Sequence, residues 1–170
     1  MDYRMKKLEE EKMKRVNAIV NHPLFKEGME QNRICEQNRI FCKHDMDHFL
    51  DVARLAYIFS MERNYKLDKE LIYAAALLHD IGRWQQYTQG IPHDKAGART
   101  AEKILKDTEF SCEEKKMIIC AIEGHRNTDH KSPLSEILYD ADKISRNCYA
   151  CCAEQECNWN DEKKNLHITW

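Results

Sequence analysis

A short apolar run, residues 72–78, ends in the ionisable pair His79-Asp80. The seven residues of this run carry no charge, glycine or proline, which indicates an apolar helix that ends at the pair. An imidazole and a carboxylate are costly to bury there unless something pairs with them. A divalent cation is their usual partner, because neutral imidazole and carboxylate are common nitrogen and oxygen ligands. The chain must therefore fold so that further ligands reach the end of this helix.

The rest of the chain also favours helices. Only five of the 170 residues are glycine and three are proline, while Ala, Leu, Glu, Lys, Met and Ile are abundant. No segment alternates in the manner of a strand, no internal repeat stands out, and the length suits one domain with a sizeable core. We therefore expect an all-α protein with a single domain over residues 1–170, in which the tail 148–170 has no assigned role.

Hydrophobic spacing, caps and prolines predict where the helices lie. The approximate ranges are 2–21, 23–41, 45–61, 68–79, 92–107, 111–125 and 132–152. Asp68 is expected as an N-cap, Ser111 and Glu114 form a capping box, and Gly82 is expected to end the fourth helix. We expect residues 83–91 to form a loop.

Composition excludes several classes of protein. The chain has 27 basic and 29 acidic residues and a formal net charge of −2, without the basic excess of a nucleic-acid-binding protein. No apolar stretch is long enough for a transmembrane helix, and the first ten residues lack the apolar region of a secretory signal. We therefore expect a soluble cytoplasmic protein that binds neither nucleic acid nor membrane. In that setting its eight cysteines are expected to be reduced or metal-bound.

Two further ionisable residues interrupt apolar helical faces. His48 shares the face of its expected helix with apolar residues that follow at positions 52, 55 and 59, and Asp142 interrupts an apolar stripe around residues 137–144. Together with His79-Asp80, three separate helices direct such groups inward. Uncompensated burial would cost several kcal/mol per charge, so a shared cation is the simplest explanation. His44 lies on the same face as His48, and Asp140 lies beside Asp142; both are alternative ligands.

This order of residues, H…HD…D, resembles the HD-domain superfamily of metal-dependent phosphohydrolases. The phrases Leu-Leu-His-Asp-Ile-Gly at 77–82 and Asp-Ala-Asp-Lys at 140–143 are similar to their family counterparts, and the match extends over about residues 44–147. The resemblance implies a helical HD-type domain. The metal ligands that it implies are His48, His79, Asp80 and Asp142.

The resemblance also separates the alternative ligands. It favours His48 over His44, because the family phrase starts at the later histidine. It favours Asp142 over Asp140, because the family ligand immediately precedes a lysine, here Lys143.

Two further histidines bear on the number of ions. His93 and His125 lie at the ends of expected helices, where His125 could complement a helix C-terminus and His93 could be a surface residue. Their order, H…HD…H…H…D, resembles the two-metal branches of the superfamily, among them the symmetrical diadenosine-tetraphosphate hydrolases. The resemblance implies that Asp80 bridges two ions and that His93 and His125 bind the second. We therefore expect one or two divalent cations, from Mn, Fe, Co, Ni, Zn or Mg.

Such a site suits phosphoryl chemistry. A bound metal lowers the pKa of its water, and a second ion stabilises charge on a phosphate. Three basic residues next to the implied ligands, Arg83, Arg126 and Lys143, could hold phosphate oxygens, while Asp80 could orient the attacking water. We expect hydrolysis of a phosphate ester or anhydride in a small, nucleotide-like phosphorylated substrate. The alternatives are a non-catalytic nucleotide-sensing module and a di-iron oxygenase of the same fold. The sequence makes no prediction of oligomeric state.

The tail contains a group of cysteines. Cys148, Cys151 and Cys152 are spaced to share one face of the last expected helix, and Cys157 follows five residues later. Thiolates suit zinc or an iron–sulfur cluster, although the spacing is not that of a zinc ribbon, and cysteine is often simply buried. We expect packed, reduced thiols, with a second metal site as the alternative.

Overall fold

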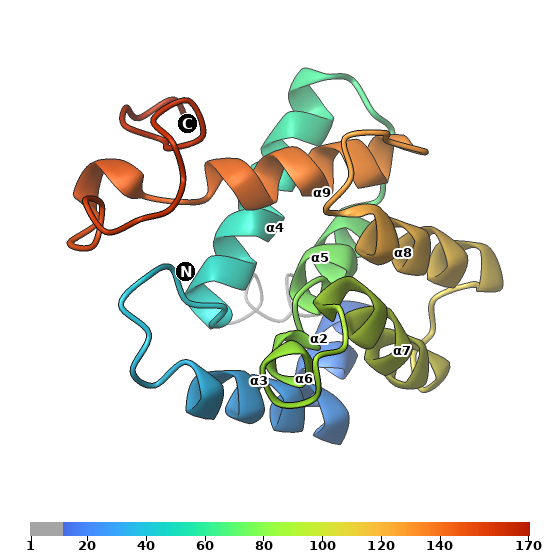
Figure 1. Ribbon diagram of the computed structural model, residues 1–170. Coiled ribbons are helices and arrows are strands. Elements are labelled where there is room, and N and C mark those ends of the chain that lie inside the picture. The colour runs from blue at the N-terminus through green and yellow to red at the C-terminus, as the bar shows by residue number, and fades with distance from the viewer. Residues whose placement is uncertain (1–11) are drawn as a thin grey trace, which may run out of the picture.

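The computed structural model describes residues 12–170, and within this range the chain is a set of helices without a strand (Figure 1). The helices are α2 (Lys14–Asn21), α3 (Pro23–Cys35), α4 (Met46–Glu62), α5 (Lys69–Leu78), α6 (Arg83–Gln89), α7 (His93–Lys106), α8 (Cys112–Gly124), α9 (Pro133–Ile144) and a 3₁₀ turn, η1 (Cys148–Ala150). The all-α prediction is confirmed. The first part of the expected helix 2–21 lies outside the described residues.

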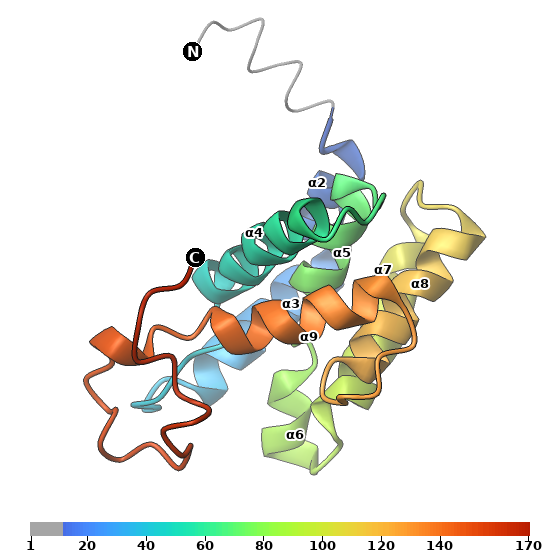
Figure 2. The same ribbon diagram turned by 90° about the horizontal axis from the view of Figure 1, so that it is seen from above.

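Helix α5 occupies the middle of the molecule. It packs against α4 and α9 on one side and against α7 and α8 on the other (Figures 1 and 2). Its apolar run is buried on nearly every face, because the small side chains of Ala74, Ala75 and Ala76 let neighbouring helices approach closely. The C-terminal end of α5 therefore lies inside the protein, and His79 and Asp80 are buried with it, with exposed fractions of 0% and 3%.

Several helices begin where local capping residues predict. The side chain of Asp68 accepts hydrogen bonds from the backbone N–H groups of two residues in the first turn of α5. Ser111 and Glu114 form both hydrogen bonds of a capping box at α8, and the side chain of Ser132 caps α9. Each cap contributes about 1 kcal/mol to stability, so these helix starts are set by short-range chemistry.

The expected loop 83–91 is wrong, because residues 83–89 form α6. Gly82 does not end α5 as a C-cap; it directly precedes α6. Gly90, the residue after α6, is in the left-handed conformation with φ 69°. The cap for the start of α6 comes from a distant helix: Asn32 of α3 accepts a hydrogen bond from the backbone N–H of Trp84 at 2.8 Å. This cap cannot be recognised in the local sequence.

Two other expected helices end early. Helix α3 ends at Cys35 rather than at residue 41, because the Glu36 side chain accepts a hydrogen bond from the backbone N–H of His44 at 2.7 Å and the chain turns back toward it. Helix α9 ends at Ile144 rather than at residue 152. There the Asn165 side chain donates hydrogen bonds to the carbonyl groups of residues 143, 144 and 146, which replaces further helical pairing.

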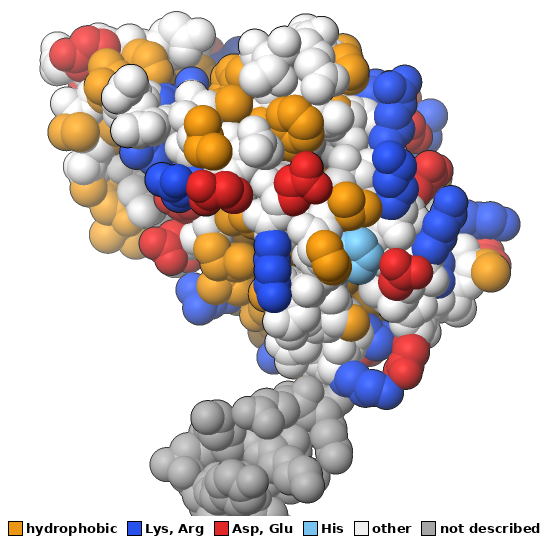
Figure 3. Space-filling model, turned by 90° about the horizontal axis from the view of Figure 1, so that it is seen from below, with side chains coloured by type: hydrophobic (Ala, Val, Ile, Leu, Met, Phe, Trp, Pro, Cys, Tyr) orange, Lys and Arg blue, Asp and Glu red, His pale blue; other side chains and the backbone are white. Residues whose placement is uncertain are grey.

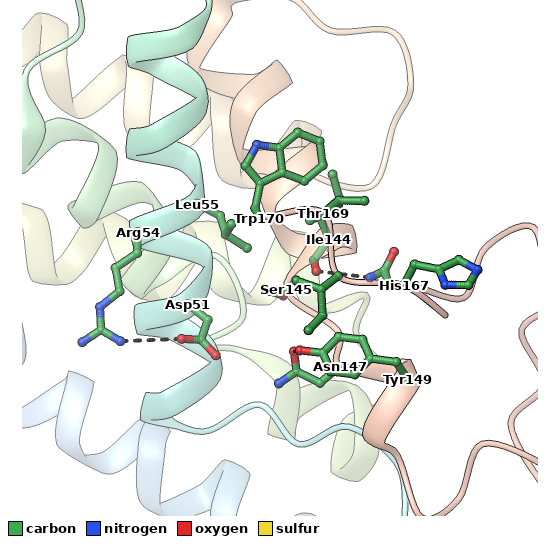
Figure 4. A pocket seen from close by; sticks show the side chains of 12 residues that line it. Asp51, Arg54, Leu55, Ile144, Ser145, Asn147, Tyr149, His167, Thr169 and Trp170 are labelled. Carbon is green, nitrogen blue, oxygen red and sulfur yellow. Dashed lines mark hydrogen bonds and ion pairs between the residues drawn. The ribbon is translucent and has the colours of Figure 1, made fainter.

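The C-terminal segment folds back over the junction of α4 and α9 (Figures 1 and 4). Figure 4 shows Trp170 and Tyr149 on opposite sides of a pocket between this segment and α4. The Trp170 ring packs edge-on against Phe59 at 5.0 Å between centroids, and its Nε1 donates to Glu62 at 3.3 Å. The tail is therefore anchored at its end as well as at Asn165.

The surface agrees with the near-neutral net charge. On the face drawn in Figure 3, basic side chains are interspersed with acidic and apolar ones and do not form one continuous basic surface. Among the helices of residues 12–170, none combines the length and the apolar character needed to cross a membrane.

Candidate metal centre

Six buried histidine and aspartate side chains meet at the N- or C-terminal ends of five helices. His48 lies in the first turn of α4, His79 and Asp80 directly follow α5, His93 starts α7, His125 follows α8, and Asp142 lies in the last turn of α9. Placement at helix ends lets side chains from separate parts of the sequence reach one cleft. These are the six residues that the sequence and the family resemblance single out as metal ligands.

Four of them form one group. His48, His79, Asp80 and Asp142 each offer a ligand atom, and these four atoms all lie within 4.8 Å of one another. Nε2 of His79 lies 3.3 Å from Oδ2 of Asp80, and Nε2 of His48 lies 3.4 Å from Oδ1 of Asp142. The group has the nitrogen and oxygen donors of a first-row metal site.

Asp80 also belongs to a second group, with His93 and His125, which meets the same 4.8 Å criterion. Its other oxygen, Oδ1, lies 3.3 Å from Nε2 of His93 and 3.7 Å from Nε2 of His125. The two oxygens of one carboxylate thus face separate histidine groups. This arrangement can hold two cations with Asp80 between them.

The unsatisfied polar atoms of the centre fit bound metal. Nε2 of His79 and Oδ1 of Asp80 are buried and lack a hydrogen-bond partner. Such atoms cost about 1–3 kcal/mol each unless an unseen group satisfies them. The Nδ1 of His79 lies 2.6 Å from the carbonyl oxygen of Ala76, and the Nδ1 of His125 lies 2.5 Å from that of Ile122. Donation by Nδ1–H to these carbonyls leaves each Nε2 lone pair free for a cation.

The electrostatics of the centre also favour a cation. Burial lowers the pKa of His48 to about 4 and that of His93 to about 3, so both rings are neutral near pH 7. Burial acts in the same direction on His79, but the carboxylates of Asp80 and Asp142 outweigh it and raise its pKa to about 10. Without metal, a proton on His79 partly balances the two carboxylates. A bound cation would take the place of this proton.

The two alternative ligands lie outside the four-residue group. Nε2 of His44 is 3.5 Å from Oδ2 of Asp80, while its Nδ1 contacts Glu36 at 2.5 Å. Burial opposes ionisation of Glu36, but the contact with His44 holds the pKa of this carboxyl at about 2. Asp140 instead accepts a hydrogen bond at 2.6 Å from Arg63, the residue that directly follows α4. His44 is therefore a neighbour of the centre, and Asp140 is not part of it.

Basic side chains line the cleft above the centre. This cleft has a volume of about 650 Å³, and the three basic residues singled out from the sequence, Arg83, Arg126 and Lys143, all line it. Two more, Arg39 and Arg146, were not predicted. Arg146 follows Asp142 by four residues, and its Nη2 lies 2.9 Å from Oδ1 of Asp142. This four-residue spacing from Asp142 was the sequence signal that could have indicated Arg146 as a neighbour of the centre.

Close backbone packing holds the turn that carries Asp80. The side chain of Asn32 donates to the backbone carbonyl of Asp80 at 3.0 Å and accepts from the N–H of Trp84, so it holds both sides of the turn. On the other side, a Cβ added to Gly82 would lie 2.3 Å from the backbone nitrogen of Gly97 in α7. Glycine at this position lets α7 approach closely enough to bring its first residue, His93, to Asp80.

Comparisons with known proteins place this centre in a family. Residues 45–147 match the HD domain family. An uncharacterized protein from Clostridium beijerinckii is 40% identical over 156 residues, which cover 92% of this chain and 99% of that protein. A crystal structure of a predicted HD superfamily hydrolase from an uncultured Thermotogales bacterium has a similar fold, with a TM-score of 0.63 and 23% identity. That alignment covers 86% of this chain and 82% of the other. The chain belongs to the HD domain family.

Proposed function

We propose that this protein is a phosphohydrolase that uses two divalent cations. In this proposal His48, His79 and Asp142 hold one cation, His93 and His125 hold the other, and Asp80 is shared. The observation that carries the proposal is the geometry of Asp80, whose two oxygens face separate histidine groups while Oδ1 has no hydrogen-bond partner.

Bound divalent cations would supply Lewis acidity, which lowers the pKa of water and stabilises negative charge on a phosphate. The chain supplies the remaining functions. Backbone carbonyls hold His79 and His125 in orientation, and in this proposal the carboxylate of Asp80 orients a water molecule. Arg83, Arg126 and Lys143 line the cleft as donors to phosphate oxygens.

The cleft also supports a nucleotide-like substrate. Besides its basic residues, it is lined by the aromatic side chains of Phe41 and Trp159. Aromatic rings stack on nucleobases, while guanidinium and ammonium groups bind phosphates. A volume of about 650 Å³ suits a small molecule rather than a polymer. The fold of this chain is similar to that of a predicted HD superfamily hydrolase, which supports hydrolysis as the class of reaction.

Metal analysis followed by a phosphate-release assay tests the proposal. The purified protein is incubated with nucleotides and dinucleoside polyphosphates, with and without Mn²⁺, Co²⁺ or Fe²⁺. We expect metal-dependent hydrolysis of a member of this panel, and the loss of both metal and activity in Asp80→Ala. Full activity in Asp80→Ala would refute the phosphohydrolase assignment.

A matched pair of variants controls for damage to α9. Asp142→Ala removes a proposed ligand, whereas Asp140→Ala removes a carboxylate two residues away that pairs with Arg63 outside the centre. We expect the first to lose metal and activity and the second to keep both. Binding of nucleotide without turnover, or metal-dependent oxygen consumption without phosphate release, would contradict hydrolysis.

A further inference from the structure

Four cysteines from two distant parts of the chain lie in the cleft or near it. Cys42 lies in the loop between α3 and α4, whereas Cys148, Cys151 and Cys157 lie in the tail beyond α9, and none of them forms a disulfide. Cys42, Cys148 and Cys157 line the same cleft. Burial raises the pKa of the Cys148 thiol, and the nearby sulfurs of Cys42, Cys157 and Cys151 raise it further, so all three lie within electrostatic range of Cys148.

The fold separates these cysteines from most of the others. Cys152, next to Cys151 in the sequence, is exposed, and so are Cys112 and Cys120 of α8. The expectation that Cys148, Cys151 and Cys152 share a helix face is wrong, because α9 ends at Ile144 and the tail is irregular. The fourth cysteine of the group is therefore Cys42 and not Cys152. Cys42 lies more than one hundred positions earlier in the chain than the other three.

The tail needs more than apolar burial to hold its conformation. Between residues 146 and 170 only Cys148 and Ala153 are buried, and the 3₁₀ turn Cys148–Ala150 is the only helical element. Fixing the backbone of one residue costs about 1–2 kcal/mol, which two small buried side chains cannot offset over this length. Small folds with so little core are usually stapled by disulfides or by metal. The four gathered thiols would supply such a staple.

We propose that Cys42, Cys148, Cys151 and Cys157 bind an iron–sulfur cluster that fixes the tail against the cleft. Four thiolates are the usual ligand set of such clusters. A single tetrahedral zinc, with Zn–S bonds of about 2.3 Å, requires sulfurs about 3.8 Å apart. Among residues 12–170, no three cysteine sulfurs lie within 4.8 Å of one another. This spacing is wider than a single zinc requires, whereas a cluster, with several iron and sulfide ions between its ligands, is held by more widely spaced thiolates.

The surroundings provide positive charge for a thiolate-rich centre. Arg146 lies close enough to Cys42 to interact with it electrostatically, and it is largely buried. Arg39 donates from Nε to the carbonyl oxygen of Cys42 at 2.9 Å and lines the same cleft. Asn158 and Trp159, which directly follow Cys157, are also cleft residues. The cluster would therefore hold part of the cleft wall beside Arg146, which pairs with Asp142 of the four-residue group.

Chemical analysis of protein purified without oxygen tests the inference. Acid-labile sulfide is the decisive readout, because iron in the histidine–aspartate centre brings none. We expect about two or four sulfides per chain, with the broad visible absorption of a cluster. Cys42→Ser and Cys157→Ser should each lose most of the sulfide, whereas the exposed-cysteine controls Cys152→Ser and Cys112→Ser should keep it.

Further measurements keep the result independent of the proposed function. His79→Ala should lose metal from the histidine–aspartate centre and retain the sulfide, which separates the two sites. Circular dichroism checks that each variant is helical, and the wild-type sulfide content decides the question even if a cysteine variant fails to fold. Absence of sulfide after reconstitution with iron and sulfide would overturn the proposal. Cysteine-dependent zinc without sulfide would also overturn it.

Discussion

Replacing Gly82 by alanine should separate α7 from the turn that carries Asp80. Gly82 has φ −93°, a conformation open to alanine, so the substitution tests contact rather than backbone strain. Its new Cβ would lie 2.3 Å from the nitrogen of Gly97, whereas ordinary contact begins at 3.4 Å, so the two backbones must separate by about 1.1 Å. Neither backbone can relieve the clash by rotating a side chain. We therefore expect the free energy of unfolding to fall by about 3 kcal/mol, near the upper end of the range for overpacking.

Urea denaturation of the metal-free protein measures this loss. With a slope of about 2 kcal/mol per molar urea, the midpoint should fall by about 1.5 M without a change in slope. The same displacement would open the 3.3 Å spacing between Asp80 and His93, so the variant should lose the second metal equivalent before the first.

Gly124→Ala is the matched control for Gly82→Ala. Gly124 ends α8 beside His125, and a Cβ there would meet only the Ser135 hydroxyl, at 3.9 Å. Alanine is a better helix former than glycine by about 1 kcal/mol, so this variant should be unchanged or more stable. If Gly82→Ala unfolds at the wild-type midpoint, the steric argument is refuted.

Three other predictions concern the centre and the helix ends. His93→Ala and His125→Ala should each reduce bound metal toward one equivalent by elemental analysis; unchanged stoichiometry would assign these histidines to the substrate instead. Metal affinity should rise about tenfold per pH unit between roughly pH 5 and 9. Within this window His79, with its pKa of about 10, must release one proton on binding, while His48, with its pKa of about 4, is already neutral. Titrations at several pH values check this, and a pH-independent affinity would contradict it. Ser111→Ala should cost about 1 kcal/mol in thermal or chemical unfolding through loss of the α8 capping box, with metal content unchanged.

The fold could be predicted where the controlling contacts are local. Asp68 and Ser111 cap helices within a few residues of themselves, so the sequence shows where those helices begin. Helix α6 was missed because its cap, Asn32, lies 52 residues from Trp84. The end of α9 was missed for the same reason, since Asn165, which donates hydrogen bonds to the last carbonyl groups of α9, lies 21 and 22 residues beyond them.

The candidate centre followed a similar rule. His48, His79, Asp80 and Asp142 stand out in the sequence because they interrupt or end apolar helices, and the family resemblance adds His93 and His125. The structure brings all six into two adjoining groups. Cys42 carries no such pattern, and Arg146 has only its four-residue spacing from Asp142, because a charged or small residue near a loop is common. Their place beside the cleft depends on how α9 ends and how the loop before α4 returns.

The ligands of the four-residue group are spread along the chain from position 48 to position 142. A cation held by them would close that length of polypeptide as a reversible cross-link between three helices. At a free concentration about a thousandfold above its dissociation constant, such an ion stabilises the folded state by about 4 kcal/mol. Cells short of the metal would then hold less of the folded protein as well as less of its activity. Supply of the ion would set how long each copy survives proteolysis.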